Sequence, residues 1–237
     1  MRPVLAMPVS KEFRVRAVLS LMRLATRDDS LERLHRAIEF EIEACSRRID
    51  EAAADGDKDF IETVIDEECD QTEELLGLAF VAAQSFITNV RTRAVMLVDV
   101  CSRDLGIRLT FVSDPKAYDI LKFAPGLLPA TGFTLVEAIN SVANYWKHSE
   151  EWPTSYIKAG KVLRPNWDLT LMRGNERRTA EIVASLGMVP GSAGNLRQAT
   201  KALGVPEFEN LSKVRQILRD WATGLHEKAC MEIGVVD

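Results

Sequence analysis

The stretch ADGDKD, from Ala54 to Asp59, decides how this chain folds, because it separates two long helical patterns. Glycine commonly follows the end of a helix, and aspartate commonly caps the start of the next one. On both sides of the stretch, apolar residues recur every three or four positions. These positions are Leu31, Leu34, Ile38, Ile42, Cys45 and Ile49 before it, and Ile61, Val64, Ile65, Leu75, Leu76, Phe80, Phe86 and Val90 after it. The pattern predicts a long antiparallel helical hairpin, of the kind found in helical bundles.

Outside the hairpin, the sequence predicts further helices joined by irregular loops. Ser10 is suited to cap a first helix, and helical character after the hairpin persists to about Cys101. The segments 105–132 and 152–174 are rich in proline and glycine, so we expect irregular loops there. The first ten residues of the earlier loop are also compatible with a short strand. Helical patterns then return in the last third of the chain.

These patterns predict a mainly α fold. The 237 residues are enough for one large core or two modest ones. We expect one domain over 1–237, or alternatively a main bundle over 1–152 with a helical appendage over 153–237. No apolar run approaches the roughly 20 residues of a membrane span, so no membrane contact is expected. The four cysteines are far apart in sequence and are expected to be reduced thiols in a cytoplasmic protein.

Charge is distributed unevenly along the chain. The net charge is −5, but residues 28–80 hold 18 acidic and 5 basic side chains, which leaves the remainder at +8. The positive charge of the residues outside 28–80 favours binding of nucleic acid, whereas the acidic 28–80 hairpin is suited to dock a protein partner. A solvated helical face is the simpler interpretation of such a charge run.

The segment FTLVEAINSVANYWKHSEEW, from Phe133 to Trp152, carries the clearest candidate site. Thr134 and Glu137 have the spacing of a capping box, and Pro153 ends the pattern. One helical face collects polar residues that are unusual in the middle of a helix. This row is Glu137, Asn140, Asn144 and His148, and Lys147 lies next to it in the sequence. They suit either a structural row of hydrogen bonds or a ligand site, in which Asn contacts base edges and Lys contacts phosphate.

Metal and cofactor sites are not indicated. Histidine is scarce, and the single Glu32-x-x-His35 is half of what a di-iron bundle requires, so we expect His35 on a helix surface. Asp66, Asp70 and Glu73 share a helical face but are expected to be solvated. The string GSAG at 191–194 precedes a helix and could cradle an anion. We therefore expect no metal and no cofactor.

The string ANYWKH followed by SEEW, preceded by a long acidic hairpin, resembles the HEPN superfamily (higher eukaryotes and prokaryotes nucleotide-binding). The resemblance covers about 28–148, alone or together with the last helix, and implies a helical bundle that forms a homodimer. It also implies RNA binding or metal-independent RNA cleavage, in a toxin–antitoxin or antiviral defence module. Active members carry an Arg, a polar residue and, four to six positions on, a His. At Asn144 to His148 this chain has Asn in place of Arg.

The segment RDWATGLH fits that signature, with Arg219, Asp220 and His226. Residues seven apart lie on the same side of a helix, so arginine could stabilise charge while histidine exchanges a proton. A solvated face containing Arg215, Arg219 and His226 is the alternative. The predicted catalytic residues are thus His148, Arg219 and His226, and the predicted binding residues are Asn140, Asn144, Lys147 and Arg215.

Three functional hypotheses follow from the sequence. The first is an RNA-binding or RNA-cleaving protein of HEPN type. The second is a non-catalytic interaction or scaffold protein that docks a partner on its acidic hairpin. The third is DNA binding by the helices around Arg177, Arg178, Arg197 and Lys201. The sequence alone does not decide whether the chain is an enzyme.

Overall fold

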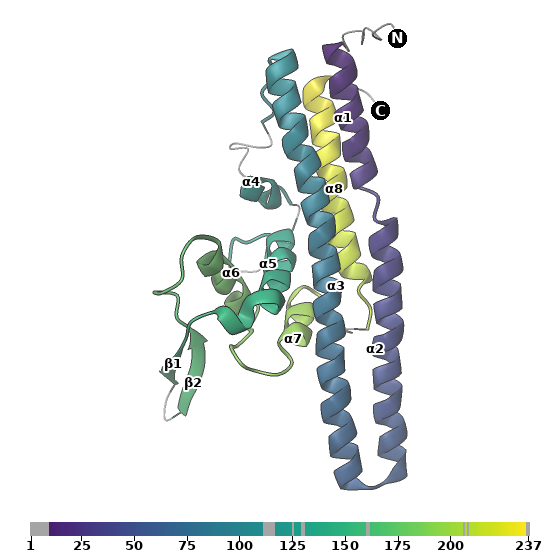
Figure 1. The fold of residues 1–237 in the computed structure, drawn as a ribbon, viewed down its shortest axis with the longest axis vertical. Helices are drawn as coiled ribbons and strands as arrows, with labels where there is room; N and C mark the ends of the chain where they lie inside the picture. The colour runs from purple at the N-terminus through teal and green to yellow at the C-terminus, as the bar shows by residue number, and fades with distance from the viewer. Residues whose placement is uncertain are drawn as a thin grey trace, which may run out of the picture.

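The computed structural model describes residues 10–110, 117–124, 126–128, 131–159, 162–205, 207 and 209–235. Helices dominate these ranges (Figure 1), which confirms the predicted mainly α bundle with its long hairpin. The elements are α1 (Lys11–Ala25), α2 (Asp29–Asp55), α3 (Lys58–Val100), a π-helical turn (Cys101–Leu105), α4 (Ala117–Lys122), α5 (Leu135–His148), a 3₁₀ turn (Ser149–Glu151), β1 (Thr154–Ala159), β2 (Val162–Trp167), α6 (Gly174–Ser185), α7 (Asn195–Ala202) and α8 (Ser212–Ile233).

The hairpin of α2 and α3 turns where the sequence predicts. Gly56 adopts a left-handed conformation with φ of 85°, which a residue with a side chain would adopt only at a cost. The Asp57 carboxylate then accepts hydrogen bonds from the amides of Asp59 and Phe60, at 3.1 and 3.3 Å. These local contacts stop one helix and start the next, so the two helices run antiparallel.

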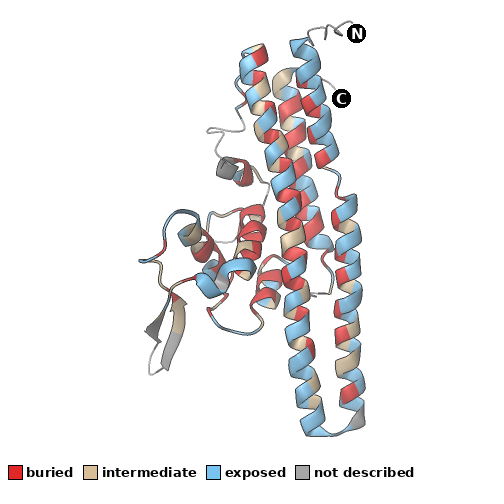
Figure 2. Ribbon diagram, viewed as in Figure 1, coloured by how far each residue is buried: buried red, intermediate tan, exposed pale blue. Residues whose placement is uncertain are grey.

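One apolar core joins the first helix of the bundle to the last. α8 packs on α1, α3 and α5, and the core contains Met22 of α1, Leu97 of α3 and Trp221 of α8. Figure 2 shows the buried residues concentrated where these helices meet. Because α8 lies within this core, the last helix is packed together with the N-terminal half of the chain. Within the described residues, no helix is both long and apolar enough to span a membrane.

The part of the hairpin nearest its turn extends beyond the other helices (Figure 1). We call residues 47–68 the acidic arm, because they include nine acidic and three basic side chains. The starting end of α1 and the final end of α8 lie at the opposite end of the molecule (Figure 1). The acidic arm is therefore separated in space from the end of the molecule where α1 begins and α8 ends.

The helix α5 starts at the predicted capping box. The Thr134 amide donates to the Glu137 carboxylate at 2.9 Å, and the Glu137 amide donates to the Thr134 hydroxyl at 3.1 Å. α5 then packs closely on α3, with the Trp146 indole over Gly77. A Cβ atom at position 77 would lie 2.1 Å from Trp146 Nε1, so only glycine leaves room for the indole here.

We expect Gly77→Ala to destabilise the fold by about 1–3 kcal/mol, because the added methyl group overlaps the indole. Alanine is intrinsically favoured over glycine in a helix by about 1 kcal/mol, so the packing clash must exceed that gain. Urea unfolding measures the difference. Gly224→Ala in α8 is the matched control, since its Cβ would approach no atom closer than 3.7 Å and should be neutral or stabilising. A stable Gly77→Ala protein would contradict the packing, and Trp146→Leu should rescue an unstable one.

The prediction of an irregular loop over 152–174 is wrong in part. β1 and β2 form an antiparallel hairpin there, with Thr154 opposite Trp167. The strand-forming residues of this segment form a hairpin despite its prolines. Pro165 is tolerated because it lies on a two-stranded ribbon, where every strand is an edge strand. Residues 107–110 form no strand, and 111–114 lie outside the described residues. The ring of Trp167 packs edge-on against Tyr145 of α5, at 5.9 Å between centroids, and so fixes the hairpin to the bundle.

Candidate functional site

The predicted polar row of α5 meets one glutamine of α3. Gln84 Nε2 donates to the side-chain oxygens of Asn140 and Asn144, at 3.1 and 2.8 Å. Its other amide atom, Oε1, accepts from Lys147 Nζ at 2.5 Å. Glu137 is buried and paired with Arg178 of α6. These contacts favour the structural interpretation of the row, because its side chains join α5 to the neighbouring helices.

His148 lies at the end of the same row and is half-exposed. Its Nδ1 atom is 3.4 Å from the Glu151 carboxylate. Together with Asn144, the two residues line a cleft of about 510 Å³ between α5 and the start of α6. The other lining residues are Trp152, Asn175, Glu176 and Thr179. The cleft contains two carboxylates and no arginine or lysine among its lining residues, so it is poorly suited to hold a phosphate.

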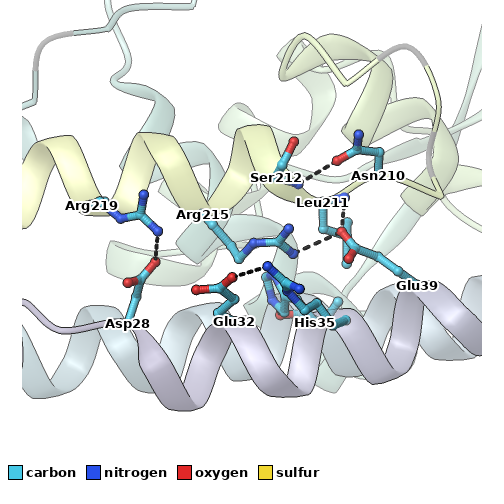
Figure 3. Close-up of polar contacts among 11 residues, drawn as sticks. Asp28, Glu32, His35, Glu39, Asn210, Leu211, Ser212, Arg215 and Arg219 are labelled. Carbon is cyan, nitrogen blue, oxygen red and sulfur yellow. Dashed lines mark hydrogen bonds and ion pairs between the residues drawn. The ribbon is translucent and has the colours of Figure 1, made fainter.

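The two predicted arginines of α8 form ion pairs with α2 and with the residue immediately before it. Arg219 donates to Asp28 at 2.7 Å, and Arg215 donates to Glu39 at 2.9 Å (Figure 3). The same Glu39 oxygen accepts from the Leu211 amide at 2.6 Å, which satisfies a backbone donor at the start of α8. Arg215 is buried, so the expected solvated face is wrong for this residue. Both arginines fasten α8 to α2.

His35 is a second correction. We expected it on a helix surface, but it is fully buried between α2 and the rest of the bundle (Figure 3). Its Nε2 atom is 3.0 Å from the Ala79 carbonyl oxygen, which can only accept, so Nε2 carries the proton. Burial lowers the pKa of His35 from 6.5 to about 4, against the opposing effect of the Ala79 hydrogen bond. The imidazole is therefore neutral at pH 7, and a structural role follows.

His226 is also buried, contrary to the expected solvated face. It follows Arg219 by seven residues, or about 10 Å along the helix axis. Its neighbours differ from those of Arg219: the Cys230 Sγ atom lies 3.7 Å from His226 Nε2, and both line a cavity at the α1–α8 end of the bundle. Two arginines of α1, Arg16 and Arg23, line the same cavity. His226 is thus placed with arginines that its local sequence does not contain.

The predicted anion site after GSAG is occupied by a side chain of this protein. The Glu73 carboxylate accepts from the backbone amides of Leu196 and Arg197 at the start of α7, at 2.8 and 3.1 Å. Glu73 is therefore a helix cap from α3, and not one of three solvated acids. Three of the four basic residues considered for DNA binding are also paired: Arg177 with Glu181, Arg178 with Glu137, and Arg197 with Glu73.

No metal centre is formed by the residues that the structure describes, since no three His, Cys, Asp or Glu side chains come together suitably. The four cysteines, all of them in described segments, are free thiols, as expected from their spacing. Burial raises the pKa of Cys101 to about 11, so this thiol is protonated and unreactive.

The acidic arm contains a hollow of about 530 Å³ between its two helices. Arg48 of α2 makes a bidentate ion pair with Glu68 of α3 at one side of it, which lowers the pKa of the Glu68 carboxyl. Phe60 and Val64 contribute apolar surface, and Glu51 and Glu67 are exposed lining residues. Ala52 and Ala54 complete the lining, and their small side chains leave the hollow open.

Fold and contacts together define a helical bundle with a projecting acidic arm. Comparison of the chain with protein-family models, curated proteins and solved structures found no match. Functional inference therefore depends on the geometry described above.

Some residues of these sites were not predicted from the sequence. Arg16, Ser20 and Arg23 are four and three positions apart on α1, a spacing that was visible in the sequence. Their cavity was not visible, because it forms only where α1 meets α8. Gln84 gave no local signal at all, since glutamine is an ordinary residue on a helix surface.

Proposed function

We propose that this chain is a non-catalytic helical interaction protein whose acidic arm docks a basic protein partner. The observation that supports this most directly is the hollow of the arm, which combines apolar surface with exposed carboxylates. Charge alone is weak support, because most acidic runs are solvated faces. An apolar hollow within an acidic surface is more specific, since it can accept an apolar side chain flanked by lysine or arginine.

The contacts within the arm determine which groups can meet a partner. Glu68 is held by Arg48, so it contributes little free charge. Glu51 and Glu67 have no such partner among the described residues and flank the apolar surface. Phe60 is 49% exposed, so about half of its surface is available for contact with a partner. A basic helix or strand with one apolar side chain could pair with the Glu51 and Glu67 carboxylates and cover the Phe60 ring.

Charge reversal of the rim tests this proposal. We expect Glu51→Lys/Glu67→Lys to weaken the binding of a basic peptide with a single leucine anchor at least about tenfold, because both attractive carboxylates become repulsive. Fluorescence anisotropy of the labelled peptide measures the affinity. Binding to the unmodified protein should also weaken between about 50 mM and about 300 mM salt, as electrostatic contacts do.

The matched control places the same charge change on α8. Asp220→Lys/Glu227→Lys alters two exposed acids far from the arm and should change the affinity by less than about threefold. Equal losses in both double variants would show that only net charge matters and would refute a docking site. Phe60→Ser should weaken binding without any change of charge.

The RNA activity implied by the HEPN resemblance stays a prediction. It is supported by the placement of His226 beside two arginines, and it is weakened by the partners found for Asn140, Asn144 and Arg219. RNA cleavage that is lost in His226→Ala or His148→Ala, with folding retained, would favour it over the docking proposal.

A further inference from the structure

The cleft of about 510 Å³ between α5 and the start of α6 combines acidic, amide and aromatic side chains. Its two carboxylates belong to Glu151 and Glu176, and Trp152 contributes the aromatic surface. No lysine or arginine lines the cleft within the part of the chain that the structure describes. The lining therefore favours a positively charged ligand.

Glu176 is the carboxylate of this cleft that is most available to a ligand. Its side chain is half-buried in the first turn of α6 and has no ion pair or hydrogen bond among the described residues. Glu151, in contrast, lies 3.4 Å from His148 Nδ1. The neighbouring acids Glu137 and Glu181 are paired with Arg178 and Arg177. Glu176 is thus left without a donor where its neighbours have one.

Thr179 lies one turn after Glu176, on the same face of α6, and also lines the cleft. It is only 6% exposed, yet its hydroxyl has no hydrogen-bond partner among the described residues. Thr63 and Thr92 instead donate to the carbonyl oxygen four residues earlier, at 3.0 and 2.8 Å. Because buried polar groups are normally hydrogen-bonded, the Thr179 hydroxyl is suited to accept a hydrogen bond from a ligand in the cleft.

Trp152 gives the cleft a fixed aromatic wall. Its ring packs edge-on against Tyr145 of α5 and Trp167 of β2, at 5.9 and 6.4 Å between centroids. These contacts hold the indole in place before any ligand binds, which lowers the entropic cost of binding. Indole rings attract cations, and they attract guanidinium groups in particular.

We propose that this cleft binds the guanidinium group of a small molecule. A guanidinium is planar, positively charged and carries five N–H donors. It can therefore pair with the Glu176 carboxylate, donate to the Thr179 hydroxyl and contact the indole at the same time. An ammonium group has the charge but lacks the planar shape. The volume of the cleft is typical of small-molecule sites and leaves room for the rest of the ligand.

Calorimetric titration of the full chain with N-acetyl-arginine amide tests the proposal. We expect saturable binding, reduced at least about tenfold in Glu176→Gln, because the charge-assisted hydrogen bonds are lost. Thr179→Val should give a smaller reduction without lowering the thermal midpoint of unfolding, because the hydroxyl has no partner to lose. Glu181→Gln is the matched control: it removes the same charge from α6 outside the cleft lining and should change the affinity by less than about twofold.

Three further ligands distinguish the chemistry that is recognised. N-acetyl-citrulline amide has the same shape without the charge, and N-acetyl-lysine amide has the charge without the planar group, so both should bind more weakly. Binding of either as tight as that of the arginine amide overturns the guanidinium assignment. Tighter binding of a glycine peptide with one central arginine overturns the small molecule in favour of a protein side chain.

Absence of saturable binding, or equal affinities for the unmodified protein and Glu176→Gln, overturns the site itself. The cleft shares no lining residue with the hollow of the acidic arm, so either proposal can fail without the other.

Discussion

Replacement of Glu39 by alanine is expected to lower the free energy of unfolding by about 3–5 kcal/mol, the usual effect of removing one partner of a buried ion pair. One Glu39 oxygen accepts from both Arg215 and the Leu211 amide. The side chains of Glu39 and Arg215 are only 15% and 10% exposed, so water cannot readily replace the lost carboxylate. The variant leaves a buried guanidinium without its partner and a backbone donor without its acceptor. Urea unfolding at pH 7 measures the loss.

Glu43→Ala is the matched control, because Glu43 lies one turn further along α2 and is exposed. It should change stability by no more than about 0.5 kcal/mol. The double variant Glu39→Met/Arg215→Met removes both charges and should recover part of the lost stability, since apolar pairs often replace buried ion pairs well. A loss in Glu39→Ala as small as that in Glu43→Ala would mean that this pair does not hold α8 on α2.

Local signals in the sequence predicted those features of the fold that depend on neighbouring residues. The hairpin turn at Gly56 and Asp57 and the capping box of Thr134 and Glu137 are each formed within a few positions, so their residue types reveal them. The β1–β2 hairpin was missed because prolines and glycines dominated the interpretation of 152–174. Its strands are stabilised by pairing with one another, and that pairing is a tertiary property which composition does not report.

The candidate sites were harder to predict, because their polar residues bind partners far away in the chain. Arg219 pairs with Asp28, and Gln84 binds two asparagines of α5. Helical periodicity shows which residues share a face, but it does not show what covers that face. A row such as Asn140 and Asn144 is therefore compatible with a ligand site and with a helix contact until the neighbouring helix is placed.

One local signal was available and was misinterpreted. The apolar stripe of α2 was predicted to include Leu34, yet Leu34 is 48% exposed and His35 takes the buried position. His35 lies four residues after Leu31 and three before Ile38, so it fits the spacing of the stripe as well as Leu34, which lies three after and four before. We expected histidine on the surface and therefore left His35 out of the stripe. A neutral imidazole with one hydrogen bond is, however, readily buried.

Burial of His35 makes the fold sensitive to acid. Its pKa is about 4 in the folded protein and about 6.5 when the chain is unfolded, so between these values only the unfolded state binds the proton. Stability should therefore be unaffected by this group above pH 6.5 and should fall as the pH decreases toward 4. A difference of this size corresponds to about 3 kcal/mol. The physical reason is desolvation of the imidazole: Nδ1 is buried and finds no hydrogen-bond partner in the described part of the chain, so a proton there would have no acceptor.

Urea unfolding at a series of pH values checks this expectation. His35→Leu should be less stable at pH 7, because the Ala79 carbonyl loses its donor, but it should lose much less stability on going to pH 4 than the unmodified protein. His148→Gln is the control: His148 is exposed, so this variant should keep the full pH dependence. If His35→Leu lost as much stability in acid as the unmodified protein, another group would be responsible. The Glu68 carboxyl acts mainly below the range in which His35 titrates, because its ion pair with Arg48 lowers its pKa.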